Sequence, residues 1–322
     1  MSIFSKKLRS RGARCARISR CVLGLGAMLW LACGSSPVLA DDADKNGAKK
    51  EEAADTEHLF GFIEGADIGE AGERELFLFL DGRAGKRRGT YAALGLNALL
   101  EYTVTDVFKF SMGAFSAYHH IRNVPGLEDR NSFNFNGLST EFKFHILDRD
   151  KFPIGLTVAL APRWNHVDPI SGAIVESYAL ETRLLADMAL VPDKVFAALN
   201  LAYEPSTAHV RNLDALTGLP VEWERASAFE ASGAVVTAVG SRAFAGAELR
   251  YLSTYQGTFF DRFEGRALFL GPILYLRLNE KLFVKGTWQA QIAGRAADEP
   301  GRSLDLVNYE RHQARLMLGV TF

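Results

Sequence analysis

Charged side chains of both signs recur at every second position along much of the chain. Residues two apart in an extended strand project from the same face, so these side chains share one face of each strand. We predict that this face lines an interior, with lining residues Asp81, Glu101, Lys109, Glu141, Lys143, Arg163, Glu181, Arg183, Glu248, Arg250, Arg277, Lys285, Arg311 and Arg315. Adding Glu73, Glu75, Asp187 and Glu230, the face carries nine acids against nine bases.

This balance of signs bears on what the interior does. A pore that strongly selects one kind of ion carries an excess of the opposite charge, whereas interleaved signs pair and offset the cost of leaving water. The sequence therefore leaves two interiors open, a narrow polar channel and a salt-bridged, largely filled core. One imbalance stands out, because five bases fall on the last four predicted strands: Arg250, Arg277, Lys285, Arg311 and Arg315. We expect them to form a basic strip with a weak preference for anions, which the acids of the first strand partly neutralise.

Residues suited to catalysis are few and badly placed. His119, His120 and His312 lie near predicted strand ends, and Ser116 precedes the histidine pair on one strand. Along an extended strand, Ser116 and His120 are too far apart to act as a nucleophile and its base. His119 and His120 point to opposite faces and cannot share a metal ion. We predict no catalytic residue, no metal and no cofactor.

Two further charged groups lie outside the strands. Glu64, Asp67, Glu70 and Glu73 recur at every third residue; a cation site is one interpretation, but a turn-rich approach to the first strand is favoured because the intervening glycines give no ligand geometry. The bases Arg83, Lys86, Arg87 and Arg88 form the tip of a predicted hairpin. Their interpretation as a clamp on lipopolysaccharide phosphates competes with that of an ordinary solvated loop.

The elements that position these residues are strands, because the apolar pattern has a period of two. Leu94, Leu96, Ala98 and Leu100 alternate with small or polar residues, for example, and the helical period does not persist anywhere in the region. We predict twelve strands, near 73–82, 90–102, 107–121, 131–146, 153–165, 176–190, 195–204, 221–238, 242–253, 266–278, 282–293 and 306–322.

The connections between these strands alternate in length. Six long, polar connections follow the odd-numbered strands, and five mostly short ones follow the even-numbered strands. Long loops therefore gather at one end and turns at the other, as in a bacterial outer-membrane barrel. Hydrocarbon offers no hydrogen bonds, so strands cross it only when every edge is paired. We predict an all-β fold, a closed antiparallel transmembrane β-barrel of about twelve strands with up-and-down topology.

The start of the chain has the form of a secretory signal. Residues 1–40 hold seven Lys or Arg, no acid, a 13-residue apolar run and a Val38-Leu39-Ala40 exit, which is typical of a cleaved signal peptide. Cleavage leaves 30 bases against 38 acids, a charge of −8, and no cysteine. The mature chain then has no basic footprint for nucleic acid. We expect 41–71 to be a disordered or irregular periplasmic lead and 72–322 to be the barrel.

Three stretches carry a resemblance to a known family: "GFIEGADIGEAGERE", "VPGLEDR" and "DLVNYERHQARLMLGVTF". They resemble an uncharacterised family of proteobacterial outer-membrane β-barrel proteins, over most of the mature chain. The terminal Phe322 is similar to the signal that the outer-membrane assembly machinery recognises in such barrels. The resemblance implies a fold and a location in the outer membrane of a Gram-negative bacterium, and it is silent on activity.

Together these features favour a porin-like channel for small polar solutes with a mixed-charge lumen, in contact with membrane lipid and lipopolysaccharide. A closed barrel that serves envelope structure or surface interaction is the first alternative. A lipid-modifying outer-membrane enzyme is the second, and the poor placement of the histidines argues against it.

Overall fold

The structure is a computed structural model, and it describes residues 56–210 and 223–322. The predicted signal peptide, residues 41–55 of the predicted lead and most of the long connection after the seventh strand lie outside the described residues.

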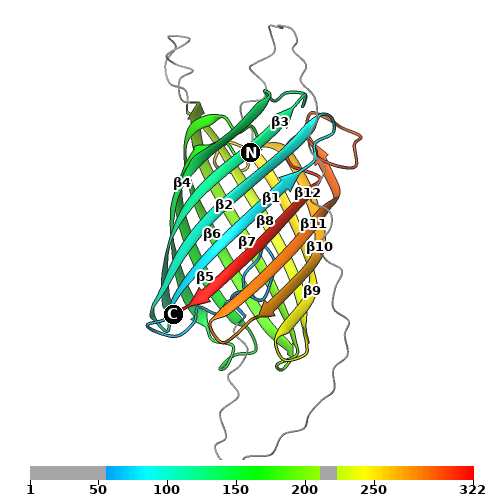
Figure 1. The fold of residues 1–322 in the computed structure, drawn as a ribbon. Helices are drawn as coiled ribbons and strands as arrows, with labels where there is room; N and C mark the ends of the chain where they lie inside the picture. The colour runs from blue at the N-terminus through cyan, green and yellow to red at the C-terminus, as the bar shows by residue number, and fades with distance from the viewer. Residues whose placement is uncertain (1–55, 211–222) are drawn as a thin grey trace, which may run out of the picture. The chain divides into compact units, whose positions relative to one another are not determined.

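Twelve strands follow one another along the described chain (Figure 1). They are β1 (Arg74–Ala84), β2 (Thr90–Thr105), β3 (Phe108–Arg122), β4 (Arg130–Leu147), β5 (Gly155–Val167), β6 (Ile174–Val191), β7 (Val195–Val210), β8 (Glu224–Val239), β9 (Ala243–Gln256), β10 (Arg262–Arg277), β11 (Leu282–Ala296) and β12 (His312–Thr321). Every strand pairs with its neighbours in the sequence, and β1 pairs with β12 to close the barrel. The predicted fold class is confirmed.

Closure leaves no strand edge unpaired. The β1–β12 ladder is antiparallel and runs from Glu75 opposite Thr321 to Ala84 opposite His312. Leu78, Leu96 and Leu274 are exposed on the outer surface, where apolar side chains suit a lipid environment. Among the described residues, no helix is long and apolar enough to cross a membrane.

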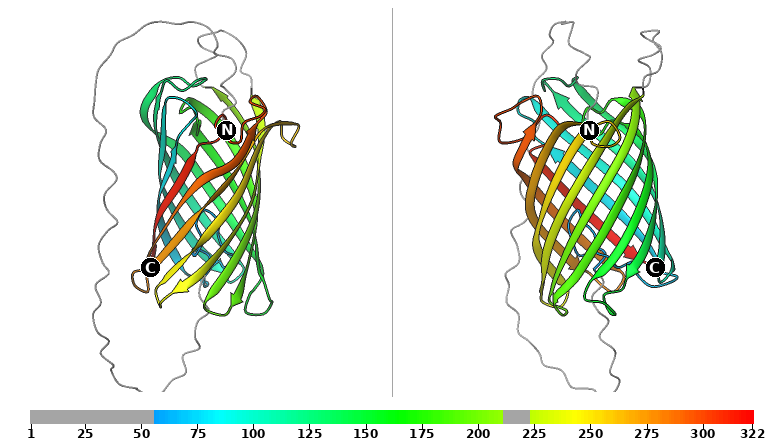
Figure 2. Two further views of the ribbon diagram at one scale, coloured as in Figure 1. Left: turned by 90° about the vertical axis from the view of Figure 1, so that its right-hand side faces the viewer. Right: turned by 180° about the vertical axis from the view of Figure 1, so that it is seen from behind.

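The two ends of the barrel differ in their connections. The connections 106–107, 148–154, 192–194, 240–242 and 278–281 lie at the end where the chain terminates, which we call the turn end. The other connections lie at the opposite end, which we call the loop end. Figure 2 shows the tilted strands that join the two ends all round the barrel.

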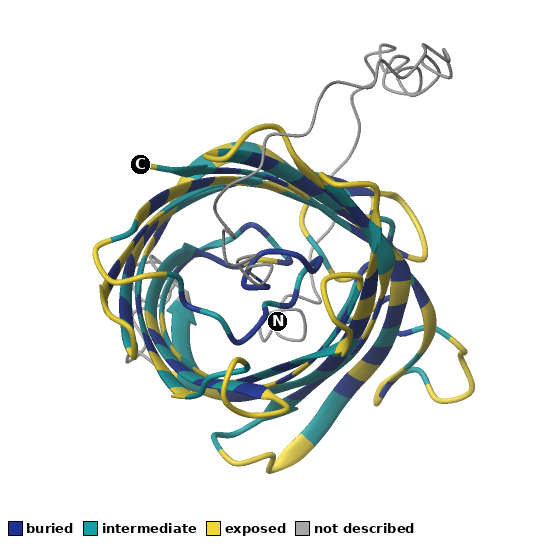
Figure 3. Ribbon diagram, turned by 90° about the horizontal axis from the view of Figure 1, so that it is seen from below, coloured by how far each residue is buried: buried dark blue, intermediate teal, exposed yellow. Residues whose placement is uncertain are grey.

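The residues just before β1 fold back into the barrel. Thr56–Glu73, which we call the inner segment, forms turns and bends rather than a strand. Viewed along the barrel in Figure 3, buried chain lies within the ring of strands. From the sequence, residues 56–71 were expected in a lead outside the barrel, whereas in the structure they lie in the lumen. The physical reason is that "HLFGFI" supplies apolar side chains that the barrel interior can bury.

An apolar core joins the inner segment to the barrel wall. Leu59, Phe60 and Ile63 are 1%, 0% and 2% exposed. They pack against inward-facing side chains of β1 and β7–β12: Phe77, Phe196, Ala198, Ala234, Val236, Phe244, Ile273, Tyr275, Phe283 and Met317. Each large apolar side chain buried in this way contributes about 1.5–3 kcal/mol. The turn-end half of the lumen is therefore filled by side chains on this side.

This packing predicts a large cost for Phe60→Ala. The substitution empties a site with no solvent access, so we expect the free energy of unfolding to fall by about 3–5 kcal/mol. The measurement is urea unfolding of the refolded barrel, followed by tryptophan fluorescence. Phe152→Ala, in an exposed turn-end connection, is the matched control; equal effects of the two substitutions would contradict the packing described.

Candidate functional site

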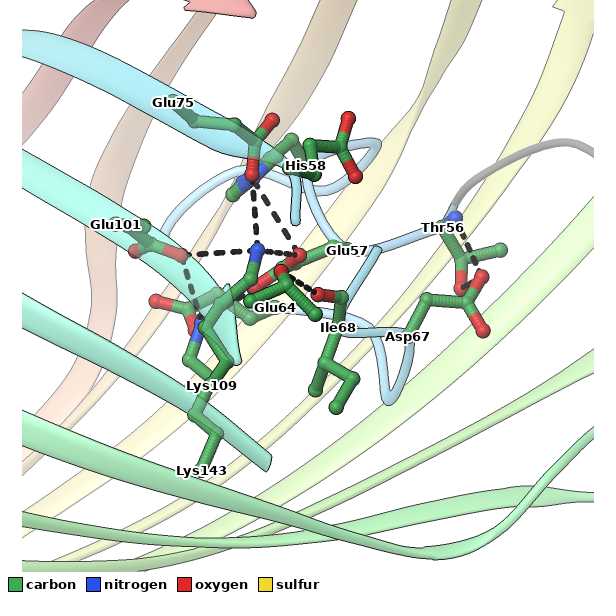
Figure 4. A network of polar contacts seen from close by, with 12 residues as sticks. Thr56, Glu57, His58, Glu64, Asp67, Ile68, Glu75, Glu101, Lys109 and Lys143 are labelled. Atoms are coloured by element: carbon green, nitrogen blue, oxygen red, sulfur yellow. Dashed lines mark hydrogen bonds and ion pairs between the residues drawn. The ribbon is translucent and has the colours of Figure 1, made fainter. Parts of the chain in front are cut away.

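Two buried lysines hold the inner segment on the β1–β4 side of the lumen (Figure 4). Lys109 of β3 and Lys143 of β4 lie directly opposite each other in the ladder. The Lys109 Nζ lies 2.6 Å from Glu57, 2.9 Å from Glu75 and 3.1 Å from Glu101. The Lys143 Nζ lies 2.6 Å from the other carboxylate oxygen of Glu57. Glu57 thus bridges two strands, and it is itself fully buried.

The strand register explains why the lysines are needed. Glu75 and Glu101 are direct partners between β1 and β2, and like charges directly opposite destabilise a sheet. The ammonium group of Lys109 contacts both carboxylates and offsets this repulsion. Removing one partner of such a buried group leaves uncompensated charge, which is far more costly than the net gain from the pairs.

A second carboxylate of the inner segment extends the network. Glu64 lies 3.0 Å from the Nζ of Lys143 and 3.0 Å from a guanidinium nitrogen of Arg183. Arg183 also pairs with Glu141. Burial alone raises the pKa of Glu64, but Arg183 and Lys143 outweigh it and hold that pKa well below its usual range. In the same way, burial raises the pKa of Glu57, and Lys109 and Lys143 lower it overall. Both carboxylates are therefore charged near neutral pH.

His58 is buried beside this network. Its Nε2 lies 3.7 Å from a carboxylate oxygen of Glu57 and 3.7 Å from one of Glu75. Its ring centroid lies 4.4 Å from that of Phe77 and is stacked 5.5 Å from that of Phe283. Burial lowers the pKa of His58, but the neighbouring Glu57 and Glu75 carboxylates outweigh it and raise the pKa above 6.5. The imidazolium form therefore stabilises this packing.

Four of these groups have the spacing of a metal site. One ligand atom from each of Glu57, His58, Glu75 and Glu101 lies within 4.8 Å of the others. The Lys109 ammonium, however, already contacts the three carboxylates at 2.6–3.1 Å. A metal ion bound by them would have to displace a buried cation. The arrangement is that of an ion-paired attachment whose central cation is an ammonium.

Two carboxylates of the wall accept hydrogen bonds from the backbone of the inner segment. Glu248 accepts from the N–H groups of Gly61 and Phe62 at 3.0 and 2.9 Å. Asp187 accepts from the N–H of Ala66 at 2.9 Å. A Cβ on Gly61 would lie 2.7 Å from a Glu248 carboxylate oxygen, so a larger residue there would force this carboxylate to shift. Irregular backbone inside a barrel is stable because such groups satisfy it.

Phe62 lies on the side of the inner segment that faces the loop end. Its ring lies between two wall arginines, with the guanidinium carbons of Arg250 and Arg315 at 4.3 and 4.9 Å from the ring centroid. Both distances fit cation–π contacts. The segment is thus held by ion pairs on one side of the lumen, by apolar packing on the other, and by arginines above.

Above the inner segment the lumen opens into a cavity of about 410 Å³. Its charged lining residues are the acids Glu64, Asp81, Glu141, Glu181, Glu204 and Glu230 and the bases Arg163, Arg183, Arg250 and Arg315. Every one of these arginines has an acidic partner: Arg163 pairs with Glu181, Arg183 with Glu141, Arg250 with Glu230 at 2.9 Å and Arg315 with Asp81 at 2.7 Å. The cavity lining combines these charged groups with apolar side chains such as Phe79 and Leu99, and its charges are paired.

The expected basic strip does not form. Arg250 and Arg315 are paired, and Lys285 is buried below them. Arg277 and Arg311 are exposed, at the end of β10 and just before β12. The cavity lining holds six acids and four arginines. The cavity therefore has no excess of positive charge, because the sequence pattern did not reveal which acids each arginine faces across the lumen, and the expected anion preference stays a prediction.

Most of the predicted lining residues do face the interior. All except Arg277 and Arg311 are buried within the lumen or line the cavity: Asp81, Glu101, Lys109, Glu141, Lys143, Arg163, Glu181, Arg183, Glu248, Arg250, Lys285 and Arg315. The sequence analysis missed Glu57, His58 and Glu204. The signal for the first two was the apolar "HLFGFI" that follows Glu57 in an otherwise charged stretch, and Glu204 continues the alternation of β7.

The basic hairpin tip does not present four free cations. Lys86 is buried, and its Nζ donates to the carbonyl oxygens of Val307 and Tyr309 at 3.2 and 2.8 Å. Arg87 pairs with Glu299 at 3.0 Å. Arg83 is half-buried, and Arg88 is exposed. Half of the proposed phosphate clamp is thus used to fasten the 297–311 connection onto this hairpin.

The histidines and Ser116 are also dispersed. His119 is buried, and its Nε2 lies 3.2 Å from the carbonyl oxygen of Pro169. The ring of His312 stacks on Trp288 at 5.4 Å. The Ser116 hydroxyl donates to the carbonyl oxygen of Leu96 at 2.6 Å. These contacts are those of structural side chains.

The raised pKa of His58 gives a pH dependence with a definite sign. Because the folded pKa lies above 6.5, the stabilisation is fully present below that pH and is lost as pH rises through the folded value. We expect the melting temperature of the refolded wild type to exceed that of His58→Gln most at acidic pH, with the difference shrinking as pH rises. A difference that stays constant or grows with pH would contradict the assignment.

Several solved structures have a similar fold. Among solved structures, the COG4313 outer membrane channel from Pseudomonas putida F1 is similar with a TM-score of 0.54, at 10% identity over 80% of this chain and 98% of that chain. The beta domain of the Bordetella autotransporter Brka matches at 0.49, with 14% identity over 79% and 100%. The NanC porin matches at 0.42, with 11% identity over 77% and 98%.

The first of these matches shows that the chain has the fold of an outer-membrane barrel. No curated protein matches the chain. One family model covers residues 52–322, which include the inner segment and all twelve strands. The chain therefore belongs to the family of unknown function DUF6662.

Proposed function

We propose that this outer-membrane barrel is a channel for small polar solutes that its own inner segment closes. The observation that carries the proposal is the charged cavity of about 410 Å³ in the loop-end half, directly above a segment that is not part of the barrel wall. The COG4313 outer membrane channel from Pseudomonas putida F1 shares this barrel fold, which agrees with the proposal.

The width of the barrel supports an interior that wall side chains alone do not fill. Barrels of eight strands are packed by their own side chains, and those of sixteen leave a wide aqueous pore. With twelve strands, this barrel buries the inner segment in one half of the lumen and keeps a cavity in the other. A solute that enters the cavity meets the inner segment, so passage requires that segment to move.

The orientation follows the rule for such barrels, with turns on the periplasmic side and loops outside. In the proposed pathway, the signal peptide 1–40 is removed after export, and the assembly machinery recognises the terminal Phe322. The inner segment then enters the lumen from the periplasmic end, where β1 begins. The cavity opens toward the outside, where solutes arrive.

The paired lining charges indicate the solute class. The lining holds six acids and four arginines, and each arginine is paired with an acid, so groups of both signs are available to small polar solutes. Charge-assisted hydrogen bonds to such groups are exchangeable with water, which permits entry and release.

A closed barrel that serves envelope structure or surface interaction is the second candidate. The observation that favours it is the complete burial of Leu59, Phe60 and Ile63. Opening would expose these side chains to water at about 1.5–3 kcal/mol each. The experiment below separates the two candidates.

A reversible lock on the inner segment tests the gating proposal. A chain that starts at Asp41 contains no cysteine, so an introduced pair forms the single disulfide. A Cβ built on Gly155 lies 3.1 Å from the Cβ of Ala66, slightly below the roughly 3.5–4.5 Å that a disulfide spans, so a small backbone shift allows the bond. We expect Ala66→Cys/Gly155→Cys to conduct in planar bilayers when reduced and to fall silent when oxidised.

The single-cysteine variants are the controls, because they carry the same side-chain changes without the lock. The Gly155→Cys control is required since its Cβ lies 2.6 Å from a carboxylate oxygen of Asp187. Silence of the wild type and of the pair in both redox states favours the closed barrel. Equal conductance in both redox states excludes the inner segment as the gate.

A further inference from the structure

A row of side chains crosses the outer wall near the loop end, on the surface opposite the lumen. Register pairs link Tyr203 of β7 with Phe229 of β8, Phe229 with Ser253 of β9, Ser253 with Arg266 of β10, and Arg266 with Arg295 of β11. Directly opposite residues in an antiparallel ladder project from the same face. The row therefore changes along the wall from aromatic to cationic.

Arg266 and Arg295 are the charged end of this row. Both are exposed, and the next outward pair toward the turn end is Leu268 with Ala293. Neither guanidinium forms an ion pair with a carboxylate in the part of the chain that the structure describes. Two like charges placed directly opposite repel each other, so an anion between the guanidinium groups would stabilise the pair.

The position of the pair sets the depth of that anion. Arg266 is the fifth residue of β10, which begins at the loop end, and Arg295 is the penultimate residue of β11, which ends there. Charged side chains on the lipid face cost about 2–4 kcal/mol at the midplane and little near the interface. The arginines thus lie where lipid headgroups, rather than acyl chains, meet the barrel.

An aromatic surface adjoins the arginines. The connection after β9 folds against the outer wall, and the ring of Phe260 lies 5.1 Å from that of Tyr203, 5.0 Å from that of Tyr255 and 6.4 Å from that of Phe229. Its backbone N–H donates to the hydroxyl of Ser227 at 3.2 Å. Phe260 has a φ of 60°, which is strained for a bulky residue. These contacts hold a conformation that the free connection would avoid.

Ser253 carries a buried hydroxyl in the middle of this row. It lies between Phe229 and Arg266 in the row and is 1% exposed. Its Oγ has no hydrogen-bond partner among the described residues, although a buried hydroxyl normally has one.

We propose that this part of the wall, from the Phe260 connection to Arg295, binds the phosphomonoester headgroup of an outer-leaflet glycolipid, the chemistry of lipid A. A phosphomonoester carries close to two negative charges at neutral pH, which matches two unpaired guanidinium groups. Each guanidinium donates charge-assisted hydrogen bonds to phosphate oxygens, and the aromatic surface packs against the apolar body of the lipid. The site relies on the proposed orientation of the barrel but not on conduction.

The test is lipid binding to the refolded mature chain in detergent, measured by native mass spectrometry with diphosphoryl lipid A. We expect Arg266→Gln/Arg295→Gln to weaken binding about tenfold or more, since each charge-assisted bond is worth more than a neutral one. Arg277→Gln is the matched control, because Arg277 is an exposed arginine at the opposite end of β10. Binding by this control should equal that of the wild type.

Two further probes identify the source of the phosphate. Phosphatidylglycerol, a phosphodiester with one charge, should bind more weakly than lipid A and respond less to the double substitution. If inorganic phosphate displaces lipid A, the site is one for free phosphate and the lipid assignment fails. Equal weakening by the double variant and by Arg277→Gln, or no weakening by either, would also overturn it. Conductance of the double variant reports separately on the channel proposal.

Discussion

The pairing of β1 with β12 is the constraint on which the rest of the structure depends. Hydrocarbon cannot satisfy a free strand edge, so the first and last strands must meet, and Glu75 lies opposite Thr321 while Ala84 lies opposite His312. A closed barrel of twelve strands has a lumen that is too wide for the inward side chains of the wall to fill. The inner segment and the cavity above it are two consequences of that one width.

The two sides of the lumen hold the inner segment by different interactions. On the side of β7–β12, aromatic and aliphatic residues such as Phe196 and Phe283 pack against the inner segment. On the side of β1–β4, Lys109 and Lys143 meet carboxylates that arrive from both the wall and the segment. Packing without charge and charge with full pairing both avoid a buried, unsatisfied group, and together they attach the same short stretch of chain.

Periodicity in the sequence was sufficient for the strands but not for what lies inside them. Alternation such as Leu94, Leu96 and Leu100 reports directly on a wall with two faces, so twelve strands and most lumen residues were predictable. The ion pairs were not, because Arg250 meets Glu230 only through the stagger between strands. The inner segment was missed since Leu59, Phe60 and Ile63 have no strand period and stand among charges. Its burial depends on a cavity that exists only after the barrel has closed.

The attachment of the inner segment to β1 has a kinetic consequence. The segment ends at Glu73 and β1 begins at Arg74, whose carbonyl oxygen accepts from the N–H of Phe322. If the inner segment leaves the lumen as proposed, it stays tethered at the turn-end rim by its direct peptide link to β1. Its return is a unimolecular event at an effective concentration in the millimolar range or above, of about the size found for short linkers. In the proposed gating, the rate of closing would then not depend on how many copies of the protein the membrane holds.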